Sequence, residues 1–198
     1  MKPVIALAAA LFVLAAPAAR AHEEVFDVTL LGSNEVPPNG STATGSATIT
    51  VDLDLLTMHI VVDFQGLTTA ATASHIHCCL STPHQAANVG VATMTPSFVD
   101  FPNATSGHYD HTFDMSLASS YNPAFVTAQG SVANAFSALM LGMEGARAYL
   151  NIHTAASFPG GEIRGFTEVS PVPEPASAAL MLLGLGGIAR AAARRRKA

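Results

Sequence analysis

The sequence predicts an all-β domain, an antiparallel β-sandwich or barrel with one or two short inserted helices. Short segments in which every second residue is apolar follow one another, and clusters of glycine, proline and asparagine separate them. No helix-length segments alternate regularly with these strands, as a parallel sheet would require. An N-terminal signal helix and a C-terminal apolar helix are expected to flank the domain.

The clearest strand signal comes from two neighbouring segments, residues 47–54 and 58–65, in which apolar and polar residues alternate. Only residues 55–57 lie between them, which leaves room for a hairpin turn alone. Other segments with many β-branched and aromatic residues extend the pattern over most of the chain. They are residues 25–31, 72–78, 89–95, 111–117, 146–153 and 161–168.

One alanine- and leucine-rich stretch departs from this pattern and predicts helix at residues 123–128 and 131–143. Its apolar residues recur at helical spacing, and Pro123 directly after Asn122 suits a helix start. We therefore expect one or two short helices before the last two strands.

The first 21 residues have the composition of a cleaved secretory signal peptide. Lys2 precedes an apolar segment at residues 4–16, and a small-x-small cleavage site ends at Ala21. The apolar segment is shorter than the ~20 residues that span a bilayer comfortably. The protein is therefore expected to be exported.

Residues 170–198 contain a linker and a second targeting segment. The tripeptide Pro173-Glu174-Pro175 is followed by an apolar run at residues 176–189 and a basic end at residues 190–197. This order resembles the PEP-CTERM sorting signal of Gram-negative bacteria. The resemblance implies secretion, processing by an exosortase-type membrane protease and transient membrane contact through the apolar helix. The expected destination is the outer envelope, the cell surface or the extracellular space.

Residues 22–169, between the targeting segments, are expected to form one domain that is long enough to bury a core. Apart from histidines, its only basic side chains are Arg147 and Arg164. Two arginines against thirteen carboxylates leave a charge of −11. Such a surface repels nucleic acid and anionic lipid and favours cations. The composition therefore excludes nucleic-acid binding as the function.

Five segments of this domain, taken in order, resemble the CHRD domain, a module first described in chordin and common in bacterial exported proteins. They are residues 28–38 with a Glu-Val-Pro-Pro turn, 44–47, 74–77 with a His-x-His strand, 149–154, and 158–165 with a Pro-Gly-Gly-Glu turn. The resemblance implies an immunoglobulin-type β-sandwich. It does not imply a particular activity, because bacterial members of the family have no settled biochemical role.

The chain departs from the family pattern in a long stretch at residues 97–143 and in a pair of adjacent cysteines, Cys78 and Cys79. Neighbouring cysteines cannot join distant strands. In an exported protein they can form a vicinal disulfide, bind a soft metal or pair with another chain. Burial as small apolar side chains is a further alternative.

The His-x-His strand is the main candidate for a metal site. His75 and His77 lie two residues apart, so both imidazoles point to one face of the strand, and His153 on another strand offers a third. Three imidazoles with an open position suit zinc or copper. The arrangement is similar to the copper side of Cu,Zn superoxide dismutase. Three further residues are close enough in sequence to add a ligand: Cys78, Cys79 and His84.

The same histidines also fit a buried polar network without a metal. Glu35, Glu162 and Arg164 would complete such a network and attach the last strand to the sheet. An arginine in so acidic a domain suggests a specific carboxylate partner, either Glu35 or Glu162. Both interpretations remain open at this point.

The sequence shows none of the common nucleophile or zinc-protease motifs, such as Gly-x-Ser-x-Gly or His-Glu-x-x-His. It therefore favours a non-enzymatic function. The expected function is that of an exported CHRD module with a structural or interaction role at the cell surface or in the extracellular matrix, where envelope components or exopolysaccharide are its partners. The alternative is a copper- or zinc-binding redox protein that resembles superoxide dismutase.

Overall fold

The computed structural model describes residues 22–155, 158–171 and 184. The expected signal peptide with its cleavage site at Ala21, the sorting motif Pro173-Glu174-Pro175 and both terminal helices lie outside the described residues. Within those residues the all-β prediction is confirmed. Antiparallel strands dominate, and there are two short α-helices.

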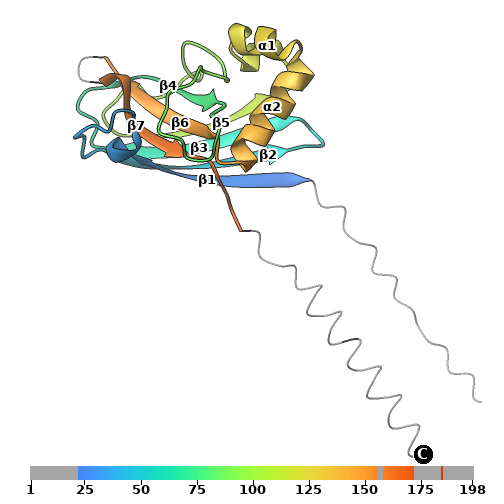
Figure 1. The fold of residues 1–198 in the computed structure, drawn as a ribbon. Coiled ribbons are helices and arrows are strands. Elements are labelled where there is room, and N and C mark those ends of the chain that lie inside the picture. Colours follow the sequence, from blue (N-terminus) through green and yellow to red (C-terminus); the bar gives the residue numbers. More distant parts are fainter. Residues whose placement is uncertain (1–21, 156–157, 172–183, 185–198) are drawn as a thin grey trace, which may run out of the picture.

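The strands form one antiparallel sheet that curls into a half-barrel (Figure 1). Its strands follow the order β4-β6-β7-β1-β2-β3-β5, and β8 pairs with the start of β1. The strands are β1 (Glu23–Leu31), β2 (Thr44–Asp52), β3 (Thr57–Gln65), β4 (Ala71–Cys78), β5 (Gly107–Asp114), β6 (Ala148–Thr154), β7 (Phe158–Phe166) and β8 (Glu168–Val169).

The inner face of the half-barrel holds the hydrophobic core. On β1 the alternation places Phe26, Val28 and Leu30 in the core, while the residues between them are largely exposed. The predicted hairpin between β2 and β3 is confirmed, and Ile49 pairs with Ile60 across it. Burial of one face fixes the register of these strands, because a shift by one residue would turn the apolar side chains to solvent.

The predicted helices are confirmed as α1 (Pro123–Gln129) and α2 (Val132–Glu144). Asn122 and Ser131 cap their N-termini by accepting hydrogen bonds from backbone N–H groups. No single helix among the described residues has the length and apolarity to cross a membrane. Together α1 and α2 meet that criterion by composition, but the chain bends by 95° between them.

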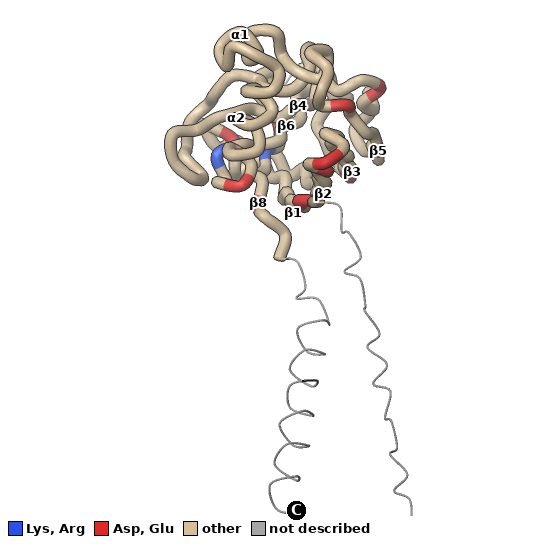
Figure 2. The backbone as a smooth tube through the Cα atoms, turned by 90° about the vertical axis from the view of Figure 1, so that its right-hand side faces the viewer, with Lys and Arg blue, Asp and Glu red and all other residues tan. Residues whose placement is uncertain are grey.

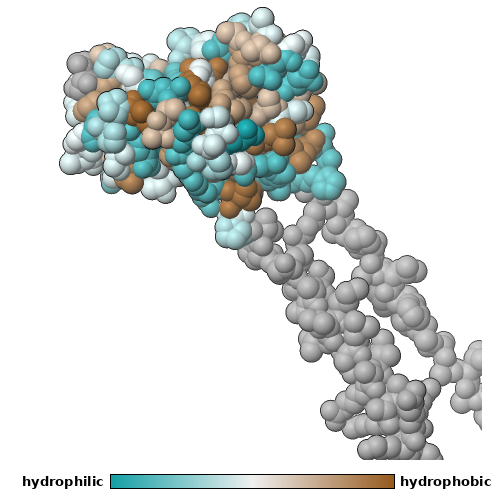
Figure 3. All heavy atoms as spheres, viewed as in Figure 1, coloured by the Kyte–Doolittle hydropathy of each residue, from teal (hydrophilic) through white to brown (hydrophobic). Residues whose placement is uncertain are grey.

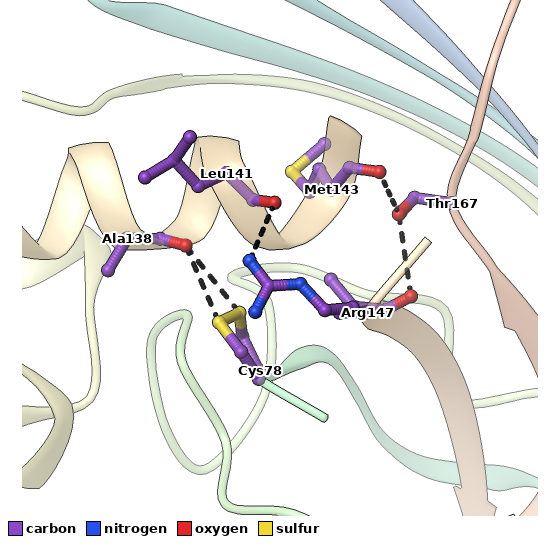
Figure 4. Close-up of a disulfide and its surroundings, with 8 residues drawn as sticks. Cys78, Ala138, Leu141, Met143, Arg147 and Thr167 are labelled. Atoms are coloured by element: carbon purple, nitrogen blue, oxygen red, sulfur yellow. Dashed lines mark hydrogen bonds between the residues drawn. A yellow bond between two sulfur atoms is a disulfide. The ribbon is translucent and has the colours of Figure 1, made fainter. Parts of the chain in front are cut away.

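Helix α2 packs against the adjacent cysteines, which form a vicinal disulfide (Figure 4). The sulfur atoms of Cys78 and Cys79 lie 3.8 and 3.4 Å from the carbonyl oxygen of Ala138. A Cβ atom on Gly142 would overlap both sulfurs, so the close approach requires glycine at this position. On the other side of α2, the Thr167 hydroxyl donates to the carbonyl of Met143 at 3.0 Å.

The prediction of a strand at residues 89–95 is wrong. Two isolated bridges, from Val91 to His77 and from Thr93 to Tyr121, are the only strand-like pairing in this segment. The Thr93 hydroxyl accepts the hydrogen bond of the Ile76 N–H at 2.9 Å, and a side chain thus replaces a backbone partner. Backbone hydrogen bonds from Ala92 to Ile76 and from Cys78 to Gly90 hold this segment along the free edge of β4.

The prediction of a strand at residues 111–117 is displaced, because β5 spans Gly107–Asp114. The chain turns after Asp114, whose carboxylate accepts a hydrogen bond from the N–H of Ser116 at 2.9 Å. This local side-chain contact ends the strand earlier than the apolar pattern indicates.

The charges of the domain are unevenly distributed (Figure 2). The two arginines lie toward α2 and β6, whereas acidic residues occur on both sides of the domain, including β1 and β3. Arg164 is buried, so it contributes little to the exposed charge. The accessible surface is therefore strongly acidic.

Candidate metal centre

Strands β4 and β6 bring three histidines together on the outer face of the sheet. His75 and His77 share one face of β4, and His75 lies opposite Asn151 on β6. His153 lies two residues beyond Asn151 and joins the same face, opposite Ala73. The core-facing side of β4 carries Ile76 instead. The register between β4 and β6 therefore positions the cluster.

The three imidazoles face one another closely enough for one metal ion. One ring nitrogen from each of His75, His77 and His153 lies within 4.8 Å of the other two. The Nε2 atoms of His75 and His153 are 2.9 Å apart. His75 is buried, whereas His77 and His153 are half-buried, so the cluster has a route to solvent.

Backbone carbonyls fix the tautomers of two histidines. The Nδ1 atom of His77 lies 2.7 Å from the carbonyl oxygen of Val89, and Nδ1 of His153 lies 2.9 Å from that of Pro159. A carbonyl only accepts, so each Nδ1 carries the hydrogen of a neutral ring and each Nε2 keeps its lone pair. Such a contact commonly orients histidine ligands of metals.

His75 completes the cluster in the metal-free protein by donating from Nε2 to His153. Its own Nδ1 is buried and has no hydrogen-bond partner among the described residues, as is true of Nε2 of His77. Buried polar atoms of this kind are uncommon, and an ordered water or an ion can satisfy them. A metal ion would replace the proton between His75 and His153, and His75 would then carry its hydrogen on Nδ1.

All three imidazoles are held neutral. Burial is the main cause that lowers the pKa of His75 to about 3, and the neighbouring His77 and His153 act in the same direction. Burial likewise lowers the pKa of His77 to about 4, although the Val89 carbonyl opposes the shift. The pKa of His153 is lowered for the same reason. Neutral rings offer lone pairs to a metal at neutral pH.

A buried ion pair lies beside the cluster. Arg164 on β7 and Glu35 form a contact of 3.1 Å between Nη2 and Oε2, and both side chains are at most 4% exposed. Asn151 donates to the other oxygen of Glu35 at 3.2 Å. Burial raises the pKa of Glu35, and the Arg164 charge opposes this shift. The pair is connected to the histidines through Asn151.

Glu162 belongs to a different part of the structure from the histidines. Its carboxylate accepts hydrogen bonds from the hydroxyls of Ser41 at 2.7 Å, Thr68 at 2.9 Å and Thr154 at 2.7 Å. The adjacent Gly161, at a φ of +130°, lies inside β7, where the register between β6 and β7 shifts. Of the residues considered for a polar network, Glu35 and Arg164 lie beside the cluster and Glu162 does not.

The three additional ligand candidates do not join the cluster. Cys78 and Cys79 are joined to each other and face α2. His84 lies 2.5 Å from a carboxylate oxygen of Glu168. The carbonyls of Val89 and Pro159, by contrast, contribute to the site although no side-chain pattern could identify them.

The fold and the site define a class of protein: an antiparallel half-barrel that carries three convergent, neutral histidines on its outer face. A family model for the CHRD domain matches residues 26–167, and one for the PEP-CTERM protein-sorting motif matches residues 171–197. The chain therefore belongs to the CHRD domain family. Its sorting motif marks it for export and for sorting to the Gram-negative cell envelope or surface by an exosortase-type system. No curated protein and no solved structure matches the chain.

Proposed function

We propose that this exported CHRD protein binds one copper or zinc ion through Nε2 of His75, His77 and His153. The convergence of three neutral imidazoles on one point carries the proposal. Backbone carbonyls bind the Nδ1 hydrogens of His77 and His153, so both rings keep the lone pair on Nε2. In the metal-free protein the lone pair of His153 accepts the hydrogen bond of His75, and that of His77 has no partner among the described residues. Imidazole nitrogens are ligands that both copper and zinc accept.

The site would leave at least one coordination position open. Three protein ligands plus an open position are typical of zinc and copper centres that accept an external ligand. The half-buried rings of His77 and His153 border this position. A copper ion held in this way can exchange electrons with a small molecule, so a superoxide assay on the copper-loaded protein is the natural test of a redox activity.

The direct test compares His77→Ala with the matched control His59→Ala in a metal titration. His59 is also a strand histidine, but it is exposed and contacts Asp110 at 2.8 Å. We expect the wild type and His59→Ala to bind one ion per chain and His77→Ala to lose tight binding. Equal, stoichiometric binding by all three proteins would overturn the proposal.

A second candidate function is a structural or interaction role at the cell surface, with envelope components or exopolysaccharide as partners. Exposed large apolar side chains favour it, since Leu55 is 71% and Leu117 is 51% exposed. Figure 3 shows apolar residues interspersed with hydrophilic ones on the face in view. Leu55 and Leu56 occupy the tip of the β2–β3 hairpin, and the N–H of Met115, two residues before Leu117, donates to the Leu56 carbonyl at 2.7 Å. Such exposed side chains can mark a contact surface.

This second function predicts that Leu55→Ser and Leu117→Ser together weaken retention of the protein in the extracellular matrix, while metal binding is unchanged. Cell fractionation measures retention. Deletion of residues 173–198 is the control for sorting, because it should mislocalise the protein whatever the domain binds. If the double variant were retained as well as the wild type, these leucines would not form a contact surface and the second function would lose its evidence.

A further inference from the structure

Arg164 is the residue on which several parts of the candidate metal centre depend. It is 1% exposed, and its guanidinium carbon lies 3.9 Å from the ring centroid of Tyr149. The Tyr149 ring in turn stacks on His77, with centroids 4.7 Å apart and an interplanar angle of 10°. A buried cation is therefore separated from a candidate ligand by one aromatic ring.

The same guanidinium holds the backbone segment that fixes His77. Its Nη1 donates to the carbonyl of Ala87 at 3.1 Å, and its Nη2 contacts the Asn88 side chain. The next residue, Val89, accepts from Nδ1 of His77 and donates its N–H to the Tyr149 hydroxyl at 3.2 Å. A planar fork of donors suits this task, whereas the single ammonium of lysine does not.

The charges around the cluster disfavour a divalent ion. The three ligands are neutral, and the nearby carboxylate of Glu35 is already bound to Arg164 and Asn151. The positive charge of Arg164 lies behind the Tyr149 ring that stacks on His77, so one aromatic ring separates it from a candidate ligand. Coulomb repulsion scales with the product of charges, so a dication is penalised twice as much as a monocation.

The number of ligands points in the same direction. The cluster offers three nitrogen atoms, and the described residues provide no fourth histidine, cysteine or carboxylate within ligand distance. Structural zinc is almost always four-coordinate and bound by protein ligands alone. Three imidazoles satisfy the low coordination number that Cu(I) accepts, whereas zinc would need an external fourth ligand.

We infer that Arg164 makes the three-histidine site selective for Cu(I) over divalent ions and positions His77 through Val89. The inference rests on the proposed metal-binding function and adds to it the charge of the ion. Arg164 acts here as a positioning and specificity-determining residue and does not touch the metal.

The test measures dissociation constants for Cu(I) and Zn(II) on the full-length exported protein and its variants. Anaerobic competition with bicinchoninate reports Cu(I), and competition with a chromogenic zinc chelator reports Zn(II). Arg164→Gln removes the charge, Arg164→Lys keeps the charge but loses the fork, and Glu35→Gln leaves the arginine uncompensated. Circular dichroism melts establish that each variant is folded.

We expect Arg164→Gln to shift the ratio of the two constants toward zinc by on the order of tenfold. Glu35→Gln should shift it toward Cu(I), which keeps the inference testable if Arg164→Gln does not fold. Arg164→Lys should weaken both ions about equally, since Val89 is held less firmly while the charge remains. Folded Gln variants with an unchanged ratio would overturn the inference, whereas a wild type that binds neither ion would overturn the proposed function itself.

Discussion

The domain contains two groups of histidines with different surroundings, and only one group is suited to bind a metal ion. Three lie at the surface, each beside a carboxylate: His59 with Asp110, His84 with Glu168 and His108 with Asp63, at 2.8, 2.5 and 2.8 Å. Of the remaining five histidines, three lie on β4 and β6, and the hydrogen-bond partners of their rings are backbone carbonyls and one another.

The difference in surroundings decides what each group can do. Exposed pairs of a histidine and a carboxylate contribute about 0–1 kcal/mol to stability. Burial of the β4–β6 histidines favours the neutral ring and leaves nitrogen lone pairs without partners. Within the described residues, only this second group combines convergence with free lone pairs.

The largest expected effect is on metal affinity when a buried histidine is removed. We predict that His75→Ala weakens binding more than a hundredfold, because the loss of a direct ligand exceeds the 10- to 100-fold typical of residues that merely support one. His108→Ala serves as the surface control and should leave the affinity unchanged. Isothermal titration calorimetry measures the metal affinity of both variants. An equal loss of affinity in both would contradict the proposed difference between buried and surface histidines.

The next effect is on the stability of the metal-free protein as pH falls. Folded His75 and His77 titrate at about 3 and about 4, against 6.5 without the protein environment. Below pH 6.5 the unfolded chain therefore binds protons that the folded chain does not, and the free energy of unfolding decreases with falling pH. Between pH 6.5 and 5 the expected loss is roughly 2 kcal/mol for each of the two.

Urea denaturation at the two pH values measures this loss. A variant with both His75→Gln and His77→Gln should show a flatter dependence, because it lacks the two groups that resist protonation. Replacement of the exposed His59 and His108 by glutamine is the control and should keep the wild-type dependence. The interpretation fails if both double variants respond to pH alike.

A smaller effect is expected from the backbone support of His77. Tyr149→Phe keeps the ring that stacks on His77 but loses the hydroxyl that accepts from the Val89 N–H. Metal affinity should fall about tenfold, as for other groups that orient a ligand. Tyr109→Phe is a matched control, because its hydroxyl donates to Val99, which lies outside the cluster. Equal affinities in the two variants would show that Val89 needs no such support.

The smallest effect is predicted for the surface group. Asp110→Asn removes the carboxylate beside His59, and the free energy of unfolding should change by less than about 1 kcal/mol, with no change in metal binding. Thermal melts at low and high salt measure it. A larger loss would mean that the exposed pairs contribute more than their solvent-screened geometry allows.

The sequence predicted the parts of the site that depend on local periodicity. The period of a strand places His75 and His77 on one face, and the structure keeps them there. The register that brings β6 beside β4 depends on pairing across more than 70 residues, which no local pattern encodes. The partners of Glu162 are likewise distant in sequence or lie across a register shift: Ser41, Thr68 and Thr154.

The segment at residues 89–96 shows why the remaining parts of the site could not be predicted from the sequence. Its apolar residues resemble a strand, yet the hydroxyl of Thr93 takes the place of a backbone acceptor, and the chain follows the edge of β4 as a loop with isolated bridges. The groups that orient His77 and His153 are the carbonyls of Val89 and Pro159. Every residue carries a carbonyl, so residue type gives no signal for them.

The most direct test is the metal content of the exported protein, purified from the envelope without a histidine tag, beside its His77→Ala variant. Elemental analysis should find about one copper or zinc ion per wild-type chain and almost none in the variant, with both proteins folded. A folded wild-type protein that contains no metal, and takes up none when copper or zinc is supplied, would contradict the account and leave the three histidines a purely structural role.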